Sequence, residues 1–287
     1  MKTYTLGISD KAMPRVLSWK EKLETAHSAG YDSVEMVIDN VNSSLKQLDF
    51  HDDQIKILRE YMEKTGVLVQ TIYLAVHKNY PMGSSNEKMC AKSMDILKKA
   101  VIFASELGNT AVQLPGYDVY YELSTQETEK RFMENLRQAA NTAAYYGVKL
   151  GLKPMDTEFL NTVQKAAYYV EQIKMDCLEI YPDVGNITNA AKLYGNDVLK
   201  DIKTGQGFLS ALQLKETLPG RYEDIPFGMG HVNFGRTIHM TWKMGVRKFA
   251  VDMNYQGNTN WRVDMMSAQN FLRCILDKLD KTGNTNE

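Results

Sequence analysis

Four polar residues stand at or near the ends of short apolar segments, and their types decide what chemistry they can do together. In chain order they are Lys153, Asp183, Gln213 and Asp252. A divalent-metal site built at such positions prefers carboxylates and imidazoles. This set holds two carboxylates, one amide and one ammonium. It therefore differs from a usual metal-ligand set at the lysine and at the glutamine.

Short apolar runs alternate with longer amphipathic segments along the whole chain. The runs predict strands at 3–8, 33–37, 68–75, 110–114, 149–153, 177–181, 210–214 and 248–253. The amphipathic segments predict helices at 17–30, 52–66, 84–108, 125–147, 161–174, 188–205, 234–245 and 262–281. Eight strand–helix pairs, without a Rossmann glycine fingerprint after the first strand, favour an α/β (β/α)8 TIM barrel over an open sheet. We expect one TIM-barrel domain over residues 1–287, with a frayed tail at 280–287.

The composition excludes several classes of protein. The 287 residues carry 34 basic and 35 acidic side chains, so the basic excess of a nucleic-acid binder is missing. The sequence has no apolar stretch of about 18 residues for a membrane span, and no apolar run of about 7–15 residues near Met1 for a signal peptide. Cys90, Cys177 and Cys274 form no CxxC pair. Reduced cysteines in a cytoplasmic protein are therefore expected.

Seven segments, in order along the chain, carry a resemblance to a known family. They are LGISDKAMP (6–14), VEMVIDN (34–40), AVHKNYPMGS (75–84), VQLPGYDVYY (112–121), PMDTEFLN (154–161), YPDVGN (181–186) and KETLPGRYEDIPFGMGHVNF (215–234). The chain resembles the xylose-isomerase-like TIM-barrel superfamily. It is most similar to the L-ribulose/L-xylulose 5-phosphate 3-epimerase branch, also known as hexulose-6-phosphate isomerase-like. The resemblance implies a ketose-phosphate isomerase or epimerase whose metal is held by Glu, Asp, His and Glu on strands five to eight.

This chain departs from the family's metal-ligand pattern at three of its four positions. Asp183 matches, whereas Lys153 replaces the first Glu. Gln213 replaces the His, Asp252 replaces the second Glu, and Met229 stands in a GxG turn where the family commonly has Glu. An ammonium about 4 Å from a cation opposes it by roughly 4 kcal/mol per pair of unit charges at an effective dielectric constant of about 20. We therefore expect no metal ligand set and no cofactor here.

Three interpretations of Lys153 remain open. It forms a buried ion-pair triad with Asp183 and Asp252 that replaces the metal structurally. Alternatively, its ammonium stabilises an enediolate oxyanion while Asp252 takes the C3 proton, and Lys153 returns a proton from the other face if its pKa is lowered. The third is a Schiff base between the lysine amine and the sugar carbonyl. Lys153, Asp183 and Asp252 are the predicted catalytic residues.

A further group of polar residues near the strand ends is predicted to bind the substrate. The group comprises Glu35, His77, Gln113, Asp156, Asn186, Gln213, Lys215, Arg221 and His231. Glu35 and Gln113 bind sugar hydroxyls or satisfy each other. His77 orients a hydroxyl or makes only a local bond, and Asp156 binds substrate or caps a helix. The turn at 227–230 presents its amides to a phosphate, or is an ordinary solvated loop.

The predicted function is a ketose-phosphate isomerase or epimerase in which Lys153 has replaced the metal. The alternative is a catalytically inactive homologue that binds a sugar phosphate. The superfamily also contains metal-dependent DNA-repair endonucleases, but the neutral net charge and the missing ligands oppose that function. The expected partners are a small phosphorylated sugar such as L-ribulose or L-xylulose 5-phosphate and, from the resemblance, a second copy in a homodimer. Neither nucleic acid nor a membrane is expected.

Overall fold

Parallel strands curl into a closed ring, which is the predicted TIM barrel. The structure, a computed structural model, describes residues 2–108 and 111–283. Within these residues the strands are β1 (Thr5–Ser9), β2 (Ser33–Val37), β3 (Leu68–Tyr73), β4 (Ala111–Pro115), β5 (Leu150–Lys153), β6 (Leu178–Ile180), β7 (Leu212–Leu214) and β8 (Lys248–Val251). The sheet order is β6-β5-β4-β3-β2-β1-β8-β7. Two parallel bridges, Ile180 with Leu209 and Asp183 with Gln213, close the gap between β6 and β7.

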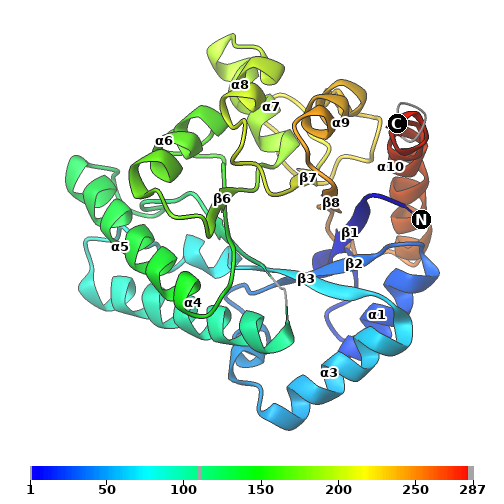
Figure 1. The fold of residues 1–287 in the computed structure, drawn as a ribbon, viewed down its shortest axis with the longest axis horizontal. Helices are drawn as coiled ribbons and strands as arrows, with labels where there is room; N and C mark the ends of the chain where they lie inside the picture. Colours follow the sequence, from blue (N-terminus) through cyan, green and yellow to red (C-terminus); the bar gives the residue numbers. More distant parts are fainter. Residues whose placement is uncertain (1, 109–110, 284–287) are drawn as a thin grey trace.

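The helices lie outside the ring of strands (Figure 1). The α-helices are α1 (Trp19–Ser28), α2 (Asn42–Leu45), α3 (Asp52–Thr65), α4 (Glu87–Leu107), α5 (Gln126–Tyr145), α6 (Val163–Ile173), α7 (Val184–Tyr194), α8 (Val198–Thr204), α9 (Phe234–Lys243) and α10 (Trp261–Gly283). Short 3-10 turns are η1 (Asp10–Ala12), η2 (Lys46–Asp49) and η3 (Ala75–Lys78). A continuous apolar core fills the space between strands and helices.

The helix predicted at 188–205 is two helices, and the local sequence explains the break. Gly195 ends α7 with a φ of 65°, a left-handed conformation that favours glycine. Two residues later the side chain of Asp197 accepts bonds from the amides of Leu199 and Lys200, which starts α8. The earlier start of α7, at Val184, follows from the capping side chain of Asp183.

The C-terminal helix extends further than the sequence predicted. Helix α10 continues through Gly283, so residues 280–283 are helical rather than frayed. The side chain of Asp280 accepts a 3.2 Å bond from the amide of Thr3, which links the two ends of the described chain. Residues 284–287 lie outside the described residues. In the part of the chain that the structure describes, no helix is long and apolar enough to cross a membrane.

The strand register brings polar side chains to the same depth inside the barrel. Tyr73 on β3 pairs with Gln113 on β4, which pairs with Gly151 on β5. Paired residues of parallel strands point to the same face of the sheet. A Cβ at Gly151 would lie 2.8 Å from the Cβ of Tyr181, so the glycine leaves the space that Tyr181 needs to reach across the barrel.

Candidate active site

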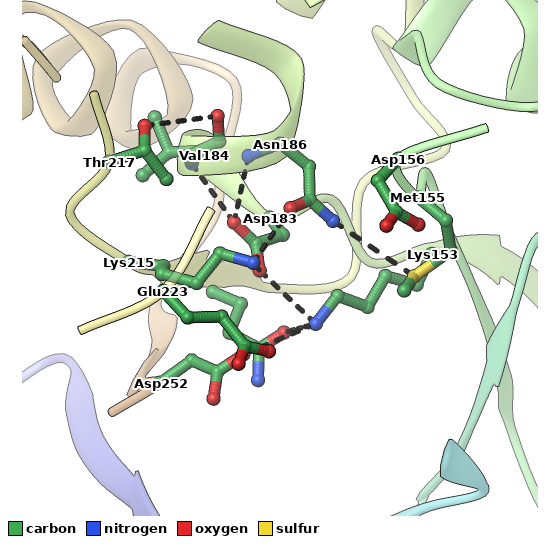
Figure 2. Close-up of polar contacts among 12 residues, drawn as sticks. Lys153, Met155, Asp156, Asp183, Val184, Asn186, Lys215, Thr217, Glu223 and Asp252 are labelled. Atoms are coloured by element: carbon green, nitrogen blue, oxygen red, sulfur yellow. Dashed lines mark hydrogen bonds and ion pairs between the residues drawn. The ribbon is translucent and has the colours of Figure 1, made fainter. Parts of the chain in front are cut away.

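Lys153 ends β5 and points into a closed ionic cluster at the carboxyl end of the barrel (Figure 2). Its Nζ lies 3.1 Å from Asp183 Oδ2 and 3.4 Å from Asp252 Oδ2. The same ammonium donates to Gln213 Oε1 and lies 4.7 Å from the ring centroid of Tyr73. Lys153 is only 1% exposed. The four polar residues that the sequence placed at strand ends therefore meet in one place.

Asp183 is held in place by the helix that it caps. Its Oδ1 accepts from the amides of Gly185 and Asn186 at 2.9 and 3.1 Å. That arrangement leaves Oδ2 for two ammonium groups, those of Lys153 and Lys215, each at 3.1 Å. Lys215 also donates to Asn186 Oδ1 at 2.7 Å. One carboxylate thus joins the start of α7 to the ends of β5 and β7.

Asp252 also lies between two ammonium groups. Its Oδ1 is 2.9 Å from Lys11 Nζ, while its Oδ2 faces Lys153. Lys11 follows β1, which pairs with β8, so the two residues are neighbours across the sheet. Burial disfavours an ionised Asp252, but the charges of Lys11 and Lys153 outweigh it and hold its pKa well below the usual range. Asp252 is therefore a carboxylate at neutral pH.

These residues do not fit a divalent metal ion. The oxygens of Asp183, Gln213 and Asp252 that could ligate a metal converge instead on the ammonium of Lys153. Among the described residues, no group of three or more His, Cys, Asp or Glu side chains could hold a metal. An additional cation here would meet repulsion from the fixed ammonium groups of Lys11, Lys153 and Lys215.

The pKa of Lys153 moves in the opposite direction from the one that its predicted role as a proton donor requires. Burial alone would lower it, but Asp183, Tyr73, Asp252 and nearby Glu35 raise it above its ordinary value. The lysine is therefore charged at neutral pH. The condition for Lys153 to act as a titrating acid–base group is not met, and a Schiff base, which needs the neutral amine, is disfavoured.

Glu35 orients Gln213. Its carboxylate accepts from Gln213 Nε2 at 2.8 Å and from the Tyr181 hydroxyl at 2.5 Å. Because the amide nitrogen faces Glu35, the amide oxygen faces Lys153. Burial raises the pKa of Glu35 to about 7. Glu35 does not pair with Gln113, whose side-chain amide is 0% exposed and has no hydrogen-bond partner within the described residues.

A cavity of about 560 Å³ opens beside the cluster. From the cluster, Lys11, Lys215 and Asp252 line it, whereas Lys153 and Asp183 lie behind them. The outer wall comes from the loops after β7 and β8 and from α10: Glu216, Arg221, Glu223, Asp224, Ile225, Pro226, Phe227, Met253, Asn254, Gln256, Asn258, Asp264, Ser267 and Ala268. Of the cluster residues, Lys11, Lys215 and Asp252 are therefore the ones that a ligand in this cavity can contact.

Two of the predicted binding residues make contacts away from this cluster. His77 is buried against α4, where its Nε2 lies 3.2 Å from the carbonyl oxygen of Ser93, and burial lowers its pKa to about 4. It is therefore neutral. Asp156 accepts a 2.5 Å bond from the Tyr117 hydroxyl. For His77 this is the local bond that the sequence left open, whereas the contact of Asp156 with Tyr117 is not the helix cap expected as its local role, because the N-cap of α6 is Thr162.

The turn at 227–230, for which the sequence left open a phosphate site or an ordinary solvated loop, contacts a carboxylate of the chain. Glu216 Oε2 accepts from the amide of Gly228 at 3.0 Å, and its Oε1 accepts from the amide of Val232 at 3.1 Å. The Glu216 carboxylate thus occupies the amide of Gly228, one of the amides of the turn that could face a phosphate. His231 contacts Thr217, with 3.0 Å between Nε2 and Oγ1. Arg221 is exposed, and its NH2 donates to the carbonyl of Asp224 at 3.2 Å.

The sequence prediction of site residues did not include Tyr73, Tyr181 or Lys11. Tyr73 lies within the third apolar run and Tyr181 ends the sixth, so the pattern is that of core residues for both. The position of Lys11 directly after the first strand was the available signal, because the first and last strands of a barrel are neighbours.

Comparisons with known proteins agree with this architecture. A family model described as "Xylose isomerase-like TIM barrel" matches residues 23–273. The chain is 32% identical over 278 residues to the L-ribulose-5-phosphate 3-epimerase UlaE of Salmonella typhi, covering 96% of each chain. It is 35% identical over 244 residues to the protein of the same name in Shigella flexneri, covering 85% of this chain and 84% of that one.

Solved structures show the same fold. The structure of an L-ribulose 3-epimerase has a TM-score of 0.78 at 16% identity, covering 98% of this chain and 97% of that one. A D-psicose 3-epimerase crystallised in the presence of D-fructose has a TM-score of 0.77 at 13% identity, with 95% and 99% covered. The family model and the relatives together show that this chain belongs to the xylose isomerase-like TIM barrel family.

Proposed function

We propose that this protein is a ketose-phosphate epimerase that works without a divalent metal, because the ammonium of Lys153 takes the metal's place. The observation that carries the proposal is the convergence of Asp183, Gln213 and Asp252 on Lys153 Nζ. The relatives named L-ribulose-5-phosphate 3-epimerase support the substrate class. The substrate is accordingly a small ketose phosphate such as L-ribulose 5-phosphate or L-xylulose 5-phosphate.

The proposed chemistry begins at Asp252, the carboxylate of the cluster that lines the cavity. Asp252 takes the C3 proton of the ketose, which leaves an enediolate. The ammonium groups of Lys11 and Lys215 on the cavity wall stabilise its negative charge, and Lys153 adds a fixed positive charge from behind. One of these two cavity-wall ammonium groups, that of Lys11 or that of Lys215, returns a proton to the other face of C3. The proton held by Asp252 then passes to that amine and restores the starting charges.

The alternative function, binding without catalysis, is supported by the same charges. The pKa of Asp252 is lowered and that of Lys153 is raised, so the first is a weak base and the second a weak acid. Both oxygens of Asp252 contact ammonium groups before any ligand arrives. A protein that had kept the sugar-phosphate pocket and lost proton transfer would have this pattern.

Proton NMR in D₂O separates the two functions. L-Ribulose 5-phosphate and L-xylulose 5-phosphate are each incubated with the protein and EDTA. We expect the C3 proton signal to disappear and the epimer to form, and we expect Lys153→Met to stop both. The matched control is Lys149→Met, because Lys149 precedes the same strand and pairs with Glu179 at 2.8 Å on a half-exposed surface. Circular dichroism checks that each variant is folded.

The other outcomes contradict the proposal in different ways. If both sugars bind but no exchange occurs, either with EDTA or after Mn²⁺ or Mg²⁺ is added, the protein is a binding homologue. Exchange that appears only after metal is added would show that Lys153 does not replace the metal. Exchange that persists in a folded Lys153→Met variant would assign the chemistry to other residues.

Two further properties belong to the same proposal. The three cysteines are free, which agrees with the proposed cytoplasmic location. A homodimer is proposed from the family resemblance. Light scattering after size exclusion tests the dimer, and a mass of about twice 32.7 kDa is expected.

A further inference from the structure

We propose that Lys215 is the general acid of the epimerisation and returns a proton to C3 on the face opposite Asp252. The inference rests on the proposed function, because it assigns one step of the same reaction. Two ammonium groups of the cluster line the cavity and are available for this step, those of Lys11 and Lys215. Their positions relative to Asp252 and their hydrogen bonds distinguish them.

The position of Lys11 places it on the side of the base. Inversion at a planar carbon needs the base and the acid on opposite faces of that carbon. Reacting atoms lie about 3–3.5 Å apart, so a base and an acid with a carbon between them are separated by roughly 6–7 Å. Lys11 Nζ lies only 2.9 Å from Asp252 Oδ1. No carbon fits between these two atoms, so Lys11 stabilises charge beside the base and does not act across from it.

Lys215 stands apart from the base. It follows β7 directly, and its ammonium contacts Asp183 Oδ2 at 3.1 Å rather than Asp252 (Figure 2). Its charge still reaches Asp252: after burial and the two lysines that contact the carboxyl, Lys215 is the next influence on its pKa, which it lowers. Lys215 and Asp252 line the same cavity of about 560 Å³. A ketose carbon in this cavity can therefore lie between the two groups.

The hydrogen bonds of Lys215 leave one proton for the ligand. An ammonium has three N–H donors. Lys215 contacts Asp183 Oδ2 at 3.1 Å and Asn186 Oδ1 at 2.7 Å, and within residues 2–108 and 111–283 its ammonium has no third partner at hydrogen-bond distance. Loss of the third proton leaves a neutral amine with two N–H donors, which keep both contacts. Lys215 can therefore release this proton without breaking a bond to the protein.

The other two cations near the cavity lack this property. Three protein oxygens surround the ammonium of Lys153, which engages all of its donors, and Lys153 does not line the cavity. Arg221 lines the cavity, but a guanidinium does not give up its proton in proteins. Lys215 is thus the cavity-wall cation that is both across from Asp252 and able to release a proton.

The assigned step exchanges one proton on each face of C3. Asp252 takes the C3 proton, and the electron pair of the broken C–H bond stays in the enediolate. The third N–H bond of Lys215 then breaks as a new C–H bond forms on the opposite face, which leaves a carboxylic acid and a neutral amine. The proton on Asp252 passes to the amine and restores the starting charges. Starting from the other epimer, the neutral amine takes the proton and Asp252 returns one.

Deuterium exchange of each epimer by itself tests this assignment. L-Ribulose 5-phosphate and L-xylulose 5-phosphate are incubated separately in D₂O with the wild type, Lys215→Arg and Lys11→Arg, and are followed by proton NMR. Because arginine keeps the charge but cannot release a proton, Lys215→Arg should slow interconversion by about a hundredfold or more. The sugar whose C3 proton faces Asp252 should still exchange it with retention, whereas the other sugar should not exchange. Lys11→Arg should still exchange and interconvert both sugars.

A second variant and a matched control keep the test independent of the fit of arginine. Lys215→Met should show the same one-sided exchange at a lower rate, because it also removes a charge that stabilises the enediolate. The control is Lys165→Met: Lys165 is also partly buried and donates to an asparagine oxygen, Asn161 Oδ1 at 3.1 Å, but does not line the cavity. It should leave both directions unchanged. Circular dichroism checks that each variant is folded.

Each other outcome overturns the assignment in a recognisable way. Exchange of both sugars in folded Lys215→Arg, or interconversion near the wild-type rate, would show that another group supplies the proton. One-sided exchange in Lys11→Arg would assign the acid to Lys11 instead. Loss of exchange for both sugars in both folded Lys215 variants would mean that Lys215 acts on the Asp252 step as well and is not the acid of one face. If the wild type itself exchanges neither sugar, the proposed function fails and the assignment fails with it.

Discussion

Similar polar groups differ in burial and in protein contacts between the inner and outer parts of the candidate active-site mouth. The inner part, formed by Glu35, Lys153, Asp183 and Gln213, is at most 2% exposed, and its charges satisfy one another. The outer part is formed by Lys11, Lys215 and Asp252 on the cavity wall. There Lys11 has few protein contacts and is open to a ligand. Buried charges that pair with one another are thus separated from charges that we propose meet the substrate, although Asp252 and Lys215 each contact the inner part.

Lys153 and Lys11 both contact Asp252, so replacing each by methionine tests this comparison. We expect the larger loss of stability at Lys153. Lys153→Met would leave Asp183 and Asp252 with one cation fewer in a buried site. Removing one partner of a buried ion pair costs about 3–5 kcal/mol. We expect a loss of that size in the free energy of unfolding, measured by urea denaturation at pH 7. A loss below about 1 kcal/mol would mean that the inner cluster does not depend on its central cation.

The next largest expected effect is on the pH dependence of the unfolding free energy, through the titration of Glu35. Burial raises its pKa from the ordinary glutamate value of 4.5 to about 7 in the fold. Between these pH values the folded state binds more protons at Glu35 than the unfolded state does, so the contribution of Glu35 to stability falls as pH rises. The difference of about 2.5 pH units corresponds to roughly 3 kcal/mol at most.

Glu35→Gln removes this titration. The fall in unfolding free energy between pH 5 and pH 8 should become smaller in the variant by up to about 3 kcal/mol. We also expect the absolute stability of the variant to fall, because a glutamine side chain has one acceptor oxygen where Glu35 has two. If its NH₂ points to Gln213, two amide nitrogens face each other; if its NH₂ points to Tyr181, the bond that the hydroxyl donates is lost. The informative quantity is therefore the difference between the wild type and the variant in the slope of unfolding free energy against pH. Parallel pH profiles for the variant and the wild type would place the pKa of Glu35 near its ordinary value.

The barrel could be predicted from the sequence, because apolar runs and helix caps are local signals. The strand ends then predicted that Lys153, Asp183, Gln213 and Asp252 lie together. The contacts of Glu35 could not be predicted in this way, since its partners Gln213 and Tyr181 come from distant strands and their register fixes the pairing. The direction of the Lys153 pKa also depended on distances, because burial and neighbouring carboxylates act in opposite directions.

The smallest expected effect is on stability in Lys11→Met, and it completes the comparison with Lys153. Lys11 is partly exposed, and Asp252 keeps its second ammonium contact, to Lys153, when Lys11 is removed. Partly exposed ion pairs contribute about 0–1 kcal/mol. We therefore expect urea denaturation at pH 7 to show a loss of no more than about 1 kcal/mol. A loss as large as that of Lys153→Met would show that Lys11 belongs to the structural cluster, and the division between inner and outer charges would then fail.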